Sequence, residues 1–95
     1  MIVLTAILKA TEGKGDAAVE EFKKLVPVVL KDPGTLGYMV CRAADDPSKF
    51  IVIEQYENRE ALAYHGQSAH FKAFGAATRG MFAGRAELTF WNKVA

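Results

Sequence analysis

The sequence predicts one α+β domain, in which a four-stranded antiparallel sheet has its helices on one face. Apolar segments rich in branched and aromatic residues alternate with segments of helical periodicity, in the order strand, helix, strand, strand, helix pair, strand. The loop between the two middle strands is so short that they are expected to form an antiparallel hairpin. A chain of 95 residues has room for one core, so we expect a single domain over residues 1–95.

The first half of the chain contains one strand and one helix. Residues Ile2 to Ala10 are mostly branched and apolar, and the turn sequence "TEGKGD" follows them. Asp16 is expected to cap a helix over residues 17–30. The apolar positions at helical spacing are Val19, Phe22, Val26 and Val29. Pro27 lies inside this pattern and is expected to kink the helix or end it early.

The hairpin pairs "LGYMVCRA" (residues 36–43) with "FIVIEQY" (residues 50–56), across the turn "DDPSK". Both strands are apolar on both faces, whereas a sheet with one solvated face alternates more cleanly. We therefore expect a second sheet to cover the face without helices, most simply in a two-fold homodimer.

The second half is predicted to contain two short helices and a final strand. Asn58 can cap a helix running to about His65, "GQS" interrupts it, and Ser68 can cap another helix. The apolar residues assigned to that second helix are Phe71, Phe74, Met81 and Phe82. Residues 85–95 are expected to form a strand with Leu88 and Phe90 on one face and Thr89 and Trp91 on the other. Two strand–helix–strand halves in series are typical of the ferredoxin-like split arrangement.

Composition excludes several classes of function. A net charge of +1 without a basic stripe argues against nucleic-acid binding. No apolar run reaches the ~18 residues that a membrane span needs. A single cysteine, Cys41, cannot form an internal disulfide and indicates a reducing cytoplasm.

The two histidines of the chain do not have the spacing of a metal site. His65 and His70 are five residues apart, which is roughly 140° of rotation on a continuous helix. Zinc ligands on a helix usually stand three or four residues apart. The "GQS" break could bring the two together, but no cluster of Cys, Asp or Glu supplies a third ligand. We therefore expect no metal.

Acid–base chemistry is the stronger interpretation of this region. Glu54 and Tyr56 alternate with Gln55, so they share one strand face, and His65 on the next helix is a ready partner for the carboxylate. A Glu–His pair can hold a general base, or it can be a buried hydrogen-bonded pair that closes the sheet. His70 falls in a first helical turn, where it either contacts substrate or is exposed.

The segment "KDPGTLGYMVCRAADDPSKFIVIEQYENREALAYHGQSAHFKAF" resembles the central part of the antibiotic biosynthesis monooxygenase domain. The matching motifs are Pro33-Gly34, Tyr38, Asp45-Asp46-Pro47, Glu54-x-Tyr56, Ala61-Leu62, His65 and His70-Phe71. Each motif is degenerate alone, but their order and spacing together are fairly specific. The flanking strands and the first helix also fit.

The resemblance implies a dimeric α+β barrel and an oxygenase that uses no metal, flavin or haem. In such an enzyme a base removes a phenolic proton from a quinol or related aromatic, and the anion reacts directly with oxygen. By resemblance, His65 is that base and Glu54 orients it, while Tyr56 and His70 hold the substrate oxygens. The residues expected to enclose the substrate ring are Tyr38, Phe71 and Trp91.

Two alternatives remain open at this stage. The same domain resembles an isomerase of a phosphorylated signalling molecule, and a non-catalytic dimeric ligand-binding stress protein would have the same fold. Haem degradation ranks low, because the first strand "IVLTAILKA" lacks the asparagine that those relatives use.

Overall fold

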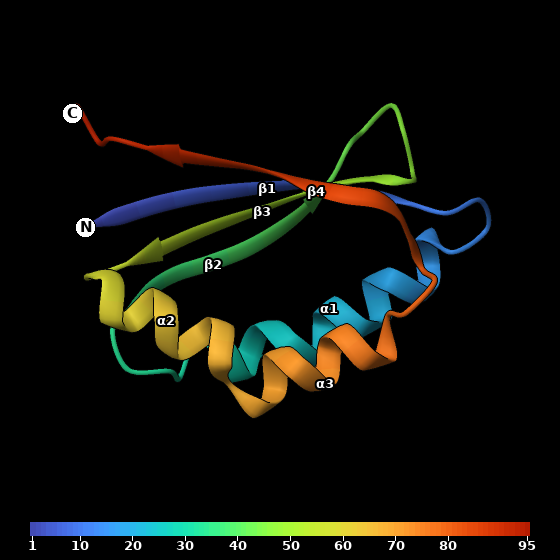
Figure 1. Cartoon of the computed structure of the whole chain (residues 1–95). Coiled ribbons are helices and arrows are strands. Elements are labelled where there is room, and N and C mark those ends of the chain that lie inside the picture. Colours follow the sequence, from blue (N-terminus) through green and yellow to red (C-terminus); the bar gives the residue numbers. More distant parts are fainter.

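Four antiparallel strands form one sheet, and three helices cover one of its faces, in the computed structural model of residues 1–95 (Figure 1). The elements in chain order are β1 (Ile2–Ala10), α1 (Gly15–Val29), β2 (Thr35–Arg42), β3 (Lys49–Tyr56), α2 (Arg59–Gln67), α3 (Ala69–Ala77) and β4 (Phe82–Trp91). The predicted fold class is therefore confirmed. None of the helices has the length and apolar character required to cross a membrane.

The strand order in the sheet is β2-β3-β1-β4, so β1 and β3 lie in the middle. Leu4 of β1 lies opposite both Glu54 of β3 and Phe90 of β4, and Tyr38 of β2 lies opposite Glu54. These four residues form one row across the sheet, and all of them are on the face that carries the helices. The row matters because two of its members, Glu54 and Tyr38, belong to the site described below.

The core lies between α1 and the sheet. The Phe22 ring on α1 packs against the rings of Phe50, Phe74 and Phe82, with centroid distances of 5.6, 5.0 and 5.9 Å. Burying one such side chain stabilises the fold by about 1.5–3 kcal/mol. This aromatic cluster therefore ties α1 to β3, α3 and β4, and it fixes the height of the helices above the sheet.

The start of α1 differs from the prediction. The helix begins at Gly15, and Lys14 occupies the cap position without a side-chain hydrogen bond. Asp16 lies inside the first turn instead of capping it, and its carboxylate is 3.0 Å from the Arg42 guanidinium. Pro27 does not end the helix early, since α1 continues for two more residues.

The two caps of the second half are confirmed. The side chain of Asn58 accepts a hydrogen bond from the Ala61 amide at 3.0 Å, and that of Ser68 accepts one from the Phe71 amide at 3.2 Å. Between the helices, Ser68 adopts an extended conformation that redirects the chain.

The second of these helices is shorter than predicted. It ends at Ala77, and a turn containing Gly80 at φ +80° follows it. Met81 and Phe82 are therefore not helical, contrary to the prediction, because the chain reverses at this glycine. Phe82 begins β4, which ends at Trp91 and not at Ala95.

The face of the sheet away from the helices is partly apolar. Met39 and Trp91 are each about half exposed there, and Ile51 and Ile53 lie between them on the central part of this face. This arrangement agrees with the predicted apolar character of both faces of the hairpin. The homodimer that would cover it remains a prediction.

Candidate active site

The carboxyl end of β3 supplies two buried polar side chains. Glu54 and Tyr56 both point to the helix-covered face, as their alternation with Gln55 predicted, and both are buried. The Tyr56 hydroxyl donates a hydrogen bond to Oε1 of Glu54 at 2.5 Å. A short O–H···O⁻ bond is charge assisted, so it offsets part of the free energy lost when the carboxylate leaves water.

His65 lies in the last turn of α2 and is surrounded by aromatic rings. It is 4% exposed, and its ring centroid is 4.6 Å from that of Phe71, 5.2 Å from that of Tyr38 and 5.9 Å from that of Tyr56. Tyr38 and Phe71, which are expected by resemblance to enclose a substrate ring, therefore both lie beside His65. The site is an imidazole enclosed by apolar rings between the sheet and the helices.

The predicted hydrogen bond between Glu54 and His65 is absent. Nε2 of His65 lies 4.0 Å from Oε1 of Glu54, which is beyond hydrogen-bonding distance. Oε1 of Glu54 instead accepts the hydrogen bond from Tyr56, which stands two residues away on the same strand face. The other ring nitrogen of His65, Nδ1, is buried without any hydrogen-bond partner. A buried polar atom left unpaired costs about 1–3 kcal/mol, so Nδ1 is a ready acceptor or ligand for an incoming group.

Burial shifts the pKa values of the polar groups at this site. It lowers the pKa of His65, while the nearby Asp32 carboxylate raises it and His70 lowers it further. The net effect keeps the imidazole neutral at neutral pH. Burial raises the pKa of Glu54, and the hydrogen bond from Tyr56 partly opposes that change. The pKa of Tyr38 is raised by burial and then by the charge of Glu54, so its hydroxyl stays protonated.

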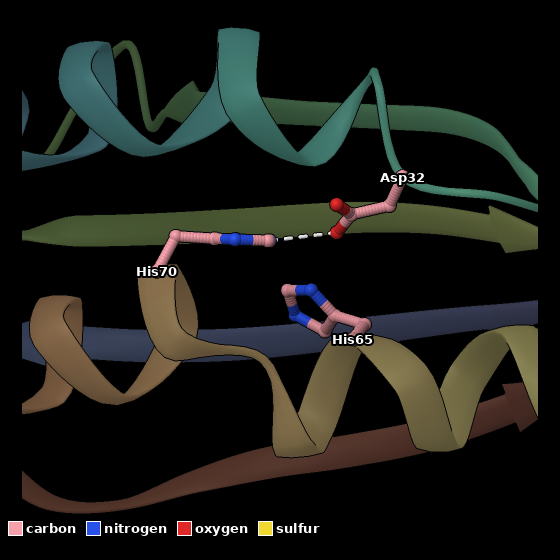
Figure 2. A group of neighbouring side chains, drawn as sticks. All are labelled: Asp32, His65 and His70. Atoms are coloured by element: carbon pink, nitrogen blue, oxygen red, sulfur yellow. Dashed lines mark hydrogen bonds and ion pairs between the residues drawn. The ribbon is translucent and has the colours of Figure 1, made fainter.

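A second pair of polar side chains lies next to His65. Nε2 of His70, in the first turn of α3, is 2.7 Å from Oδ2 of Asp32, which follows α1 (Figure 2). In Figure 2 the His65 ring faces this pair. One ligand atom from each of the three residues lies within 4.8 Å of the others.

The convergence of these residues corrects two expectations. The two histidines do not diverge, because the extended Ser68 separates α2 from α3 and lets their side chains meet. A third residue able to bind a metal is also present, namely Asp32, which the sequence did not single out. The one local signal was the turn sequence "KDPGT", where an aspartate precedes Pro-Gly. Nothing in that turn indicated which distant side chains it would meet.

Trp91 is not part of the site, contrary to the prediction. It pairs with Val3, on the face of the sheet away from the helices, and its Nε1 donates to Oγ1 of Thr5 at 2.8 Å. Strand alternation therefore places Phe90, and not Trp91, on the helix-covered face. Phe90 is 62% exposed there because β4 is an edge strand.

A cavity with a volume of about 590 Å³ lies between α1 and the edge strand β2. Its walls are mostly apolar and include Phe22, Val26 and Phe50, with Arg42 among the few polar residues. Tyr38 lines this cavity and also contacts the ring of His65. Ligand sites typically measure 300–1,000 Å³, so the cavity has room for an aromatic ring next to the site.

This fold, with a buried histidine, a carboxylate and aromatic rings between sheet and helices, defines a small α+β protein with an enclosed polar site. Comparison with known proteins gives the family. The family model described as "Antibiotic biosynthesis monooxygenase" matches residues 1–77. The chain belongs to the antibiotic biosynthesis monooxygenase family, and so to the monooxygenase class of oxidoreductases.

Individual relatives agree with this assignment. The chain is 34% identical over 90 residues to "Probable quinol monooxygenase YgiN" of Escherichia coli strain K12, covering 84% of this chain and 86% of that protein. A solved structure from Caulobacter crescentus CB15 is 30% identical, with a TM-score of 0.90 over 99% of this chain and 90% of that one. PA3566 of Pseudomonas aeruginosa has a TM-score of 0.92 at 24% identity, covering 99% and 94% of the two chains, and it shows the fold alone.

Proposed function

We propose that this protein is a cofactor-independent monooxygenase that oxidises a quinol or a related phenol with molecular oxygen. The observation that supports it most is the neutral, buried His65 ring, which has an unpartnered nitrogen and is enclosed by aromatic side chains. The name of the Escherichia coli relative, a probable quinol monooxygenase, supports the same substrate class.

The chemistry needs no external reductant, because the substrate supplies the electrons. A hydroquinone and one O₂ give a hydroxyquinone and one water, so one oxygen atom enters the ring and the other is reduced. The step that the protein must assist is loss of a phenolic proton. Phenols of this kind have a pKa of about 10, as tyrosine does, and their anions are far richer in electrons than the neutral forms.

His65 is the proposed proton acceptor, through Nδ1. Its lowered pKa keeps it unprotonated at neutral pH, and the Asp32 carboxylate stabilises the imidazolium that forms on proton transfer. Proton transfer from a phenol to His65 is thermodynamically unfavourable. The subsequent reaction of the anion with oxygen must therefore consume the anion and shift the equilibrium. Burial among the rings of Tyr38 and Phe71 keeps water from competing for the nitrogen.

The substrate ring is proposed to lie against Tyr38, on the side of the apolar cavity. Tyr56 then acts as a positioning residue, since its hydroxyl is committed to Glu54. His70 is proposed to contact the second substrate oxygen through its other ring nitrogen, because its Nε2 is held by Asp32.

Oxygen uptake with a panel of hydroquinones tests the proposal. We expect His65→Gln to lower the uptake rate by about 10²–10⁴-fold, the usual contribution of a positioned base. Gln67→Ala, at an exposed position of the same helix, serves as the matched control and should leave the rate unchanged. Uptake that is at background for every hydroquinone, or equal in wild type and His65→Gln, would contradict the proposal.

We also propose that two copies pack through the open face of the sheet, which carries Met39, Ile51, Ile53 and Trp91. Sedimentation at micromolar concentration should show a dimer, and Met39→Glu should shift it toward monomer. A stable wild-type monomer would refute this assembly.

The single exposed thiol, Cys41, fits a reducing compartment such as the cytoplasm.

A further inference from the structure

Three side chains from separate parts of the chain converge at the junction of α2 and α3. Asp32 comes from the turn after α1, His65 from the last turn of α2 and His70 from the first turn of α3 (Figure 2). The side chains of Asp32 and His65 are only 7% and 5% exposed, and that of His70 is 22% exposed. Two imidazoles and one carboxylate form a ligand set that suits borderline divalent ions of the zinc group.

We propose that Asp32, His65 and His70 bind one divalent transition-metal ion of the Zn²⁺ class. The proposal goes beyond the proposed oxidation, which needs no metal. It depends on the positions of the three side chains, and not on the identity of any substrate.

The separations between the ligand atoms are close to those that an ion requires. Metal–ligand distances of about 2.0–2.2 Å in tetrahedral geometry place ligand atoms about 3.4 Å apart. Here Nε2 of His70 and Oδ2 of Asp32 are 2.7 Å apart, and all three ligand atoms lie within 4.8 Å of one another. An ion would enter by separating the His70–Asp32 pair slightly and drawing His65 inward, with side-chain shifts of about an ångström.

His65 is suited to the role of ligand because one of its nitrogens is free and the other faces a carboxylate. Nδ1 has no hydrogen-bond partner although it is buried. Nε2 lies 4.0 Å from Oε1 of Glu54, and a small inward rotation would let Nε2–H donate to it. A carboxylate behind a ligating histidine fixes its tautomer and raises its basicity, which is the usual outer arrangement at protein metal sites.

The site would have three protein ligands and one open position. Three ligands plus a fourth position for water or a small oxygen ligand is the arrangement of catalytic zinc sites and not of closed structural ones. The His65 lone pair cannot hold a metal and accept a proton at the same time. A bound ion is therefore expected to oppose the proposed base chemistry.

Metal titration of the purified full-length protein tests the proposal without any substrate. After treatment with a chelator and its removal, Zn²⁺ binding is followed by isothermal titration calorimetry and Co²⁺ binding by visible absorption. We expect one ion per chain, and a Co²⁺ spectrum of tetrahedral or five-coordinate type with nitrogen ligands. The variants are His70→Gln and Asp32→Asn, with Asp45→Asn as the matched control at an exposed aspartate.

We expect His70→Gln and Asp32→Asn each to weaken Zn²⁺ binding by more than about 100-fold, and Glu54→Gln to weaken it by about 10- to 100-fold. Asp45→Asn should bind like wild type. Circular dichroism checks that each variant is folded, and His70→Gln is the safest because its side chain is the most exposed of the three. No binding to the wild type, or equal binding by all variants, would overturn the proposal. Because no substrate is present, a negative oxygen-uptake result leaves this test unaffected.

Discussion

Removing the hydroxyl of Tyr56 should destabilise the protein in a pH-dependent way. Tyr56 is 0% exposed, and its hydroxyl is 2.5 Å from Oε1 of Glu54, which is 6% exposed. A hydrogen bond to a charged group contributes about 1.5–3 kcal/mol. Tyr56→Phe should therefore lower the free energy of unfolding at pH 7 by about 2 kcal/mol. For a domain of this size that corresponds to a fall in Tm of about 8–16 °C.

The pH dependence follows from the raised pKa of Glu54. A carboxyl whose pKa is higher in the folded state stabilises the fold below its unfolded pKa of about 4.3, and this contribution is lost as pH rises through the folded pKa. The hydrogen bond from Tyr56 opposes that rise, so the variant should have a still higher pKa at Glu54. The destabilisation by Tyr56→Phe should accordingly be largest at neutral pH and fall toward about 1 kcal/mol near pH 4, where a neutral pair remains.

Urea unfolding at both pH values is the assay. Tyr64→Phe is the matched control, because Tyr64 is 48% exposed and should lose less than about 0.5 kcal/mol. A double-mutant cycle with Glu54→Gln isolates the pairwise coupling between the two side chains. A destabilisation by Tyr56→Phe that is the same at both pH values, or as small as that of Tyr64→Phe, would refute the reasoning.

Three further predictions concern the turn before β2, the buried histidine and the proposed metal. Gly34→Ala should lower the free energy of unfolding by about 2–4 kcal/mol in urea titrations, because φ is +78° and the added Cβ would lie 2.6 Å from that of Ala61. Gly75→Ala, in open space within α3, should instead raise it by up to about 1 kcal/mol, and equal effects would contradict the geometry. The lowered pKa of His65 means that its contribution to stability is present above about pH 6.5 and is lost as pH falls through the folded value. Between about pH 6.5 and 5, the free energy of unfolding should fall more for wild type than for His65→Gln. Equal falls in the two proteins would contradict this prediction. One equivalent of Zn²⁺ should reduce hydroquinone-dependent oxygen uptake, and a chelator should restore it; uptake that is unchanged with the ion bound would show that His65 is not both ligand and base.

Much of the fold follows from local sequence. The Asn58 and Ser68 caps act within three residues of themselves, so the starts of α2 and α3 could be predicted. The alternation in β3 placed Glu54 and Tyr56 on one face for the same reason. The end of α3 was predicted less well, because apolar spacing continues past Gly80 although the chain turns there.

The sequence by itself determined the order of elements, the fold class and the polar pair at the end of β3, because each depends on contacts between residues near in the chain. Only the tertiary structure decided the partners across the sheet and between the helices. The sheet register places Trp91 on the face away from the helices, and Glu54 accepts a hydrogen bond from Tyr56 and none from His65. The break at Ser68 turned two histidines, five residues apart, toward one aspartate from a distant turn. Residues separated by more than 30 positions meet only when core packing fixes the height and angle of each helix relative to the sheet. No local sequence pattern predicts that geometry.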